Sequence, residues 1–121
     1  MKYFAKVLSL CYFLGAVLHL ADIFDLRLKF SEMNPIWKSW IIYLTIFDLV
    51  AGIGLWNNRS WGFLFFLIVT ASQLLAYTVF SGFFGEQLPL IIFHCVALCT
   101  YLLLLIIRKT SHVYGAIKNA K

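Results

Sequence analysis

The fold of this chain is decided by a stretch that reads LPLIIFHCVALCTYLLLLII, residues 88–107. It contains no Lys, Arg, Asp or Glu, and as an α-helix it is long enough to cross a hydrocarbon core of roughly 30 Å. Three further apolar runs of similar length precede it, and charged residues gather in the gaps between them. The four runs are residues 3–21, 36–56, 61–80 and 88–107. The sequence therefore predicts an all-α integral membrane protein with four spans.

The composition agrees with this prediction and narrows the function. The chain is 63% hydrophobic and 12% charged, whereas a soluble domain is typically about 25% charged. The runs leave only short connections, so we expect residues 1–121 to form one transmembrane domain, an antiparallel up-down four-helix bundle. The three cysteines form no C-x-x-C pair, and no nucleotide motif or complete catalytic set is present. These absences argue against an enzyme.

The basic residues predict the orientation in the membrane. One side of the predicted bundle carries seven basic residues and no acidic ones: Lys2, Lys6, Arg59, Arg108, Lys109, Lys118 and Lys121. The opposite side mixes Arg27, Lys29 and Lys38 with Asp22, Asp25, Glu32 and Glu86. The positive-inside rule then predicts that both termini are cytoplasmic, in a bacterial inner membrane. The basic fringe suits anionic lipid headgroups and is too short for a nucleic-acid surface.

Residues at the ends of the runs support these boundaries. All four tryptophans lie at span ends, where their rings prefer the headgroup level: Trp37, Trp40, Trp56 and Trp61. Asn34-Pro35 reads as an N-cap followed by a proline at the first helical position, and Pro89 is expected to play the same part. The loop at 22–34 is expected to be a short interfacial helix or a strand-like cover, and the end of the tail after Arg108 to be frayed.

Polar residues inside the spans are the candidate functional residues, because such residues are costly in lipid. At 1.5 Å per residue, His19, Gln73 and His94 lie roughly 5, 10 and 9 Å below the outer edge. We therefore expect the two histidines to face each other across the bundle, with Gln73 beside them and Asp22 one turn above His19. Asp48 is expected deeper, roughly 18 Å from that edge. The predicted buried polar set is Asp48, Gln73, Thr100 and Tyr101.

Several chemistries fit these residues, and the sequence leaves them open. In the simplest, His94 is a neutral imidazole bonded to Gln73 or Tyr77, and Asp48 is a protonated carboxyl bonded to a hydroxyl. Alternatively, His19 and His94 ligate one b-type haem from opposite faces. The same histidines with Asp22 could instead bind a metal ion. A quinone or lipid pocket between aromatic-rich helices is a further possibility.

The second span carries a family resemblance. The stretch FDLVAGIGLW, residues 47–56, followed by a short basic turn and a third apolar run, resembles the second-span pattern of small DoxX-like membrane proteins. In that family an acidic residue precedes a Gly-x-Gly-Leu helix end. The stretch FLGAVLHL, residues 13–20, is similar to the family's glycine-containing first span. The resemblance covers about half the chain and implies four helices and a role as a quinone-linked or redox accessory subunit.

His19 stands near the place of the basic residue that usually follows the first-span glycine in that family. No shared site is carried over to the chain.

We therefore expect a non-catalytic accessory or assembly subunit of a membrane redox or transport complex. Its expected partners are the lipid bilayer and other membrane protein subunits or further copies of itself. One alternative is a membrane redox protein that holds haem or a metal at His19 and His94. Another is an oligomeric small transporter or channel with Asp48 on its pathway.

Overall fold

The structure, a computed structural model, describes residues 1–120, and Lys121 lies outside the described part. All regular elements in this part are helical: α1 (Lys2–Ile23), the 3-10 helix η1 (Phe30–Glu32), α2 (Pro35–Trp56), α3 (Ser60–Thr78), α4 (Ser81–Phe84) and α5 (Leu88–Asn119). Four of them, α1, α2, α3 and α5, are long and apolar enough to cross a membrane. The expectation of an all-α protein with four apolar helices is confirmed.

The ends of the helices follow the apolar runs closely, with one difference. The first three long helices begin and end within two residues of the predicted spans. The fourth begins at Leu88 as predicted but continues through the polar tail to Asn119, for 32 residues. At 1.5 Å per residue this is about 48 Å, well beyond a hydrocarbon core of roughly 30 Å. The tail is therefore a helical extension of the last span and not a frayed end.

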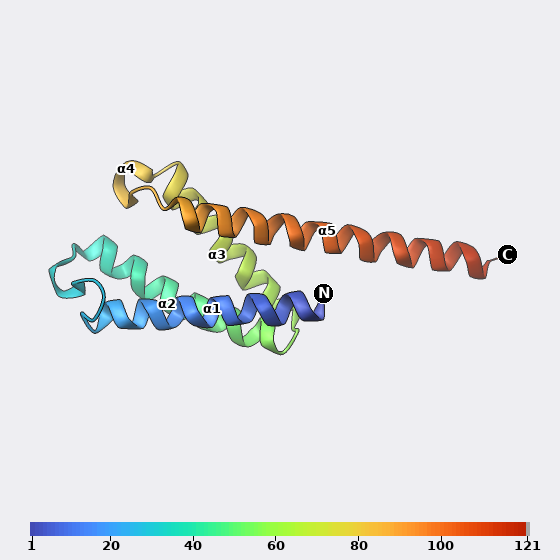
Figure 1. Cartoon of the computed structure of the whole chain (residues 1–121), viewed down its shortest axis with the longest axis horizontal. Helices are drawn as coiled ribbons and strands as arrows, with labels where there is room; N and C mark the ends of the chain where they lie inside the picture. Colours follow the sequence, from blue (N-terminus) through green and yellow to red (C-terminus); the bar gives the residue numbers. More distant parts are fainter. Residues whose placement is uncertain (121) are drawn as a thin grey trace. The chain divides into compact units, whose positions relative to one another are not determined.

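The chain divides into two compact units, Lys2–Gln73 and the part from Leu74 onward. In the first unit α1 and α2 run antiparallel and lie side by side along most of their length (Figure 1). Their shared core is made of small and medium side chains, among them Ala5, Leu8, Leu44 and Ala51. Small residues let two backbones approach closely, which is how helices associate in lipid.

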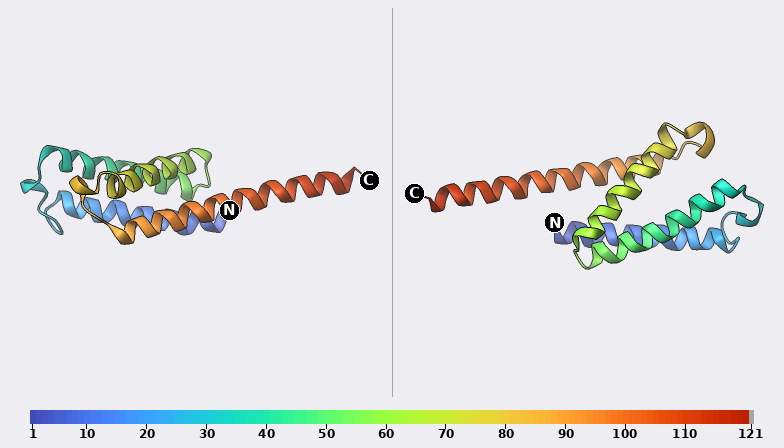
Figure 2. Two further views of the ribbon diagram at one scale, coloured as in Figure 1. Left: turned by 90° about the horizontal axis from the view of Figure 1, so that it is seen from above. Right: turned by 180° about the vertical axis from the view of Figure 1, so that it is seen from behind.

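Two glycines bring α2 and α3 together next to the turn that joins them (Figure 2). A Cβ atom on Gly62 would lie 2.2 Å from the carbonyl carbon of Gly54, so the two backbones touch at this crossing. Asn58 in the turn adopts a positive φ of 52°, which asparagine tolerates better than most residues. The close crossing explains why glycine stands at both positions.

The connection between α1 and α2 contains η1 and no strand. At its end Asn34 caps α2, because its side-chain oxygen accepts a hydrogen bond from the Trp37 N–H at 2.9 Å. Pro35 occupies the first turn of α2, as the sequence predicted. Earlier in the loop Asp25 has a φ of 56°, and its Oδ1 accepts a hydrogen bond from the Ser31 N–H at 3.0 Å.

The second unit holds α4 and α5. Gly85 ends α4 with a φ of 77°, a conformation that glycine adopts without strain. Pro89 lies in the first turn of α5. Figure 2 shows α5 as one continuous helix. His94 and Ala97 are the buried residues of this helix.

Candidate functional site

A short chain of charged side chains extends from the loop after α1 into the α1–α2 hairpin. It starts at Arg27, whose guanidinium donates two hydrogen bonds to the Asp22 carboxylate: Nε to Oδ1 at 2.8 Å and Nη2 to Oδ2 at 2.6 Å. The Asp22 side chain is 1% exposed, and that of Arg27 is 47% exposed. The hydrogen-bonded Asp22 carboxylate raises the pKa of Arg27. This bidentate pair carries no net charge and joins the loop to the end of α1.

His19 lies between two carboxylates. Its Nδ1 is 3.7 Å from Asp22 Oδ2, and its Nε2 is 3.6 Å from Asp48 Oδ2. Both distances are within ion-pair range and slightly longer than a hydrogen bond. The His19 side chain is 17% exposed, whereas the Asp48 side chain is 5% exposed. The four side chains therefore run in the order Arg27, Asp22, His19 and Asp48, and the Arg27 side chain is the most exposed of the four.

The direction of helical side chains explains why His19 meets Asp48. Side chains lean toward the N-terminus of their own helix. Because α1 and α2 are antiparallel, His19 leans toward the middle of the hairpin and Asp48 leans toward the loop end. Gly15 makes room for this meeting, since a Cβ at that position would lie 2.8 Å from Asp48 Oδ2.

Asp48 is buried with one oxygen unsatisfied. The residue is 3% exposed, and Oδ1 has no hydrogen-bond partner within residues 1–120. His19 Nδ1 is likewise buried without a hydrogen-bond partner within residues 1–120, whereas the Ser9 hydroxyl donates to the Gly52 carbonyl at 2.7 Å. The Tyr12 and Thr70 hydroxyls lie 3.3 Å apart. A buried oxygen without a donor is expensive for an ionised carboxylate, and native structures contain only a few such groups.

The charges of this cluster can be balanced in two ways. Arg27 and Asp22 together are neutral. His19 and Asp48 together are also neutral, either as imidazolium with carboxylate or as imidazole with carboxylic acid. The two forms differ only in the position of one proton, so the proton can move between Nε2 and Oδ2 without creating net charge in a low-dielectric site. Adding or removing one proton leaves a single buried charge.

The remaining residues predicted for the site are placed as follows. Gln73 and His94 are buried, at 4% and 2% exposed, and they belong to different units. Thr100 and Tyr101 are only half-buried, and the Thr100 hydroxyl donates to the Val96 carbonyl of its own helix at 2.8 Å. The predicted meeting of His19 with His94 joins the two units and stays a prediction, as does a haem between them.

The metal prediction rests on His19, Asp22 and His94. Across residues 1–120, no group of three His, Cys, Asp or Glu side chains is arranged to hold a metal ion. What the hairpin itself brings together is one histidine with two aspartates, and one of these aspartates is already bound by Arg27.

Two features of the cluster were not expected from the sequence. The first is the direct contact of His19 with Asp48, because a depth count along the helix axes ignores the lean of side chains. The second is the role of Arg27, which sequence analysis treated only as an outer basic residue. Its spacing from Asp22, five residues across a helix end, is the signal that points to a loop-closing pair.

Residues 1–112 match the model of a protein family described as "Family of unknown function (DUF6163)". The chain belongs to this family. No curated protein and no solved structure matches it. The DUF6163 family description assigns no activity, so function is argued from the charged cluster. The resemblance to DoxX-like proteins stays a prediction.

Proposed function

We propose that this protein is a non-catalytic subunit of a membrane redox or transport complex and that it contributes a buried protonation site. The observation that carries the proposal is the His19–Asp48 contact, in which a carboxylate with an unsatisfied oxygen lies 3.6 Å from an imidazole. Intramembrane ionisable residues in such positions mark ion pathways and proton relays. Histidine is suited to this work because it exchanges protons near neutral pH.

Each residue of the cluster has a separate part in the proposal. Arg27 holds the Asp22 carboxylate in place at the loop end through two hydrogen bonds. Asp22 faces His19 Nδ1 and stabilises the imidazolium when a proton arrives. His19 passes a proton from Nε2 to Asp48, and Asp48 stores it in the hairpin interior. The proposed relay ends at Asp48 within the hairpin, and in an accessory role another subunit supplies the group that receives the proton from Asp48.

A self-sufficient transporter is the second candidate, since the same buried Asp48 would serve it. A chain of 121 residues with four candidate spans has little room to enclose a path alone, so this candidate requires a homo-oligomer. The haem alternative is less well supported. Both ring nitrogens of His19 face carboxylate oxygens, and axial ligation would require Nε2 to turn away from Asp48.

Infrared difference spectroscopy of the purified protein tests the protonation site. We expect a carbonyl stretch of a protonated carboxyl that changes with pH, shifts in D2O and disappears in Asp48→Asn. The matched control is Asp25→Asn, which removes a loop carboxylate and should leave the band unchanged. A wild-type spectrum without a protonated carboxyl at any pH from about 5 to about 8 contradicts the proposal.

Proteoliposomes separate the accessory role from self-sufficient transport. With the purified chain alone, we expect no proton flux above that of empty vesicles. Flux that depends on Asp48 would establish the transporter instead. In native membranes, the accessory role predicts that the chain migrates in an assembly heavier than the oligomer formed by the purified chain. Equal sizes in the two preparations contradict it.

A further inference from the structure

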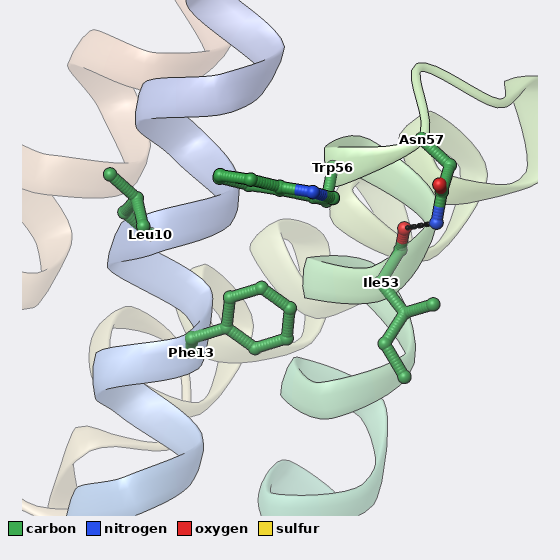
Figure 3. Close-up of a pocket in the computed structure, with 5 residues that line it drawn as sticks. All are labelled: Leu10, Phe13, Ile53, Trp56 and Asn57. Carbon is green, nitrogen blue, oxygen red and sulfur yellow. Dashed lines mark hydrogen bonds between the residues drawn. The ribbon is translucent and has the colours of Figure 1, made fainter.

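A pocket opens between α1 and α2 at the end of the hairpin that lies opposite the charged cluster. It has a volume of about 290 Å³ and is lined by Leu10 and Phe13 from α1 and by Ile53, Trp56 and Asn57 from α2 and the following turn (Figure 3). Four of the five lining side chains are apolar, and Asn57 is the polar exception. The Asn57 amide is occupied, because its Nδ2 donates to the Ile53 carbonyl at 2.9 Å. The walls therefore suit a hydrocarbon chain.

Gly52 determines the depth of the pocket. A Cβ atom there would lie 2.8 Å from Phe13 Cε1, so the ring rests directly on the backbone of α2. Leu10, Ile53 and Trp56 are substantially exposed beside it, at 57%, 44% and 44%. These exposures and the ring position leave an apolar recess on an exposed surface of the hairpin.

A basic group lies against Trp56, one of the side chains that line this recess. The Lys6 ammonium lies 3.8 Å from the centroid of the Trp56 ring, a cation–π contact that fixes its position. Lys6 precedes Leu10 by one helical turn. Lys2 and Arg59 lie at the same end of the hairpin, and residues 1–21 and 49–73 contain no Asp or Glu. The charge at this end therefore complements an anion.

We propose that this recess binds an anionic phospholipid, with one acyl chain along Phe13 and Ile53 and the headgroup phosphate on Lys6. Three observations point to a lipid. The recess is apolar, the Lys6 ammonium lies over the ring of one of its lining residues, and Trp56 lies at the helix end where aromatic rings meet headgroups. This site is independent of the proposed protonation site.

Native mass spectrometry of the detergent-purified protein tests the site. Phosphatidylglycerol and phosphatidylcholine with the same acyl chains are added in equal amounts. We expect preferential retention of phosphatidylglycerol and about a fivefold loss of that retention in Lys6→Gln, from the loss of one headgroup cation. Lys118→Gln, a charge change in the last turn of α5, is the matched control and should retain the lipid. Equal retention of the two lipids, or no loss in Lys6→Gln, overturns the proposal.

A second measurement needs no variant. Wild-type protein in vesicles is labelled with phosphatidylglycerol that carries a photoreactive group in its acyl chain. We expect the label in peptides that contain residues 10–13 and 53–57, whereas labelling spread evenly over all apolar helices overturns the site.

Competition identifies the occupant. A quinone added at the same concentration should not displace the lipid. Displacement would assign the recess to a quinone and overturn the lipid proposal. Ile53→Trp, which fills the recess, should abolish retention, and Val17→Trp on the exposed part of α1 should not. Retention that survives Ile53→Trp in folded protein also counts against the site.

Discussion

His19 Nε2 lies 3.6 Å from Asp48 Oδ2, although His19 lies near the end of α1 and Asp48 lies well inside α2. The two Cα positions are at different heights, and the opposite lean of side chains on antiparallel helices closes the gap. The contact makes a buried carboxylate and a histidine one chemical unit. The residues around this contact determine how each substitution in this region affects stability and the Asp48 carboxyl.

Gly15→Ala tests the contact without removing either partner. The added Cβ would meet Asp48 Oδ2 at 2.8 Å, and the carboxylate end can move away. We expect a loss of stability in detergent of about 1 kcal/mol, at the low end of the cost of overpacking, while the pH dependence of the Asp48 carboxyl band changes because the carboxylate leaves His19.

Two other glycines provide the comparison for that variant. Gly62→Ala places its Cβ 2.2 Å from the Gly54 carbonyl carbon. Backbone cannot move aside as a side chain does, so we expect a loss of about 1–3 kcal/mol or more. A Cβ on Gly115 meets nothing within 4 Å, and Gly115→Ala should leave both stability and the carboxyl band unchanged. If Gly15→Ala leaves the band as in wild type, Gly15 does not set the position of Asp48.

Asp48→Leu removes both the charge and the polarity of the side chain, whereas Asp48→Asn removes only the charge. Asparagine keeps the shape and a polar group opposite His19, so we expect a stability within about 1 kcal/mol of wild type. Leucine leaves the imidazole Nε2 without a polar neighbour, and we expect a loss of about 1–3 kcal/mol. Thermal unfolding in one detergent measures both. Equal stability of wild type and Asp48→Leu would mean that the His19–Asp48 contact stabilises nothing.

Arg27→Gln should weaken the loop end of the hairpin. Asp22 is 1% exposed, and without the guanidinium its charge is left uncompensated. Breaking a fully buried ion pair costs roughly 3–5 kcal/mol of stability. Because about half of the Arg27 side chain is in solvent, we expect a smaller loss in the free energy of unfolding, about 1–3 kcal/mol. Arg27→Lys should recover part of this, since lysine restores the charge without the two-point geometry. Lys29→Gln is the control, because its pair with Glu32 is exposed. Equal melting temperatures for Arg27→Gln and Lys29→Gln would refute the role of Arg27.

Some features of the fold and of the charged cluster follow from the sequence, and others do not. The ends of α2 follow from Asn34, Pro35 and Trp56, because capping and interfacial preferences are local. The contact of His19 with Asp48 depends on the register and lean of two packed helices, which periodicity alone does not specify. The length of α5 does not follow from the sequence pattern, because the polar residues after Arg108 end the apolar span and not the helix.

The loop after α1 should respond to acid through Asp25. The backbone N–H of Ser31 bonds to the Asp25 carboxylate and lowers the pKa of that carboxyl below its ordinary value. Because the folded-state pKa of Asp25 is lowered, its hydrogen bond to Ser31 stabilises the loop at pH values above the unfolded pKa of about 3.9. This stabilisation is lost as the pH falls through the folded-state pKa. We expect faster exchange of the Ser31 amide hydrogen in that acidic range, measured by NMR in detergent. In Asp25→Asn the acid-dependent step should be absent. A step of the same size in that variant would assign the acid response to another group.

The orientation of the chain is predicted from its basic residues and can be measured directly. Fusing a reporter active only in the cytoplasm to the C-terminus should give signal, because the basic residues at the N-terminus, around Arg59 and after Ile107 have no acidic neighbours and such segments stay inside. The same reporter inserted within residues 27–34 should be silent. As a matched control, a reporter active only outside the cytoplasm should give the opposite pattern at both places. If the loop fusion is active and the C-terminal fusion silent, the charged cluster opens toward the cytoplasm, and protons would reach His19 from that side.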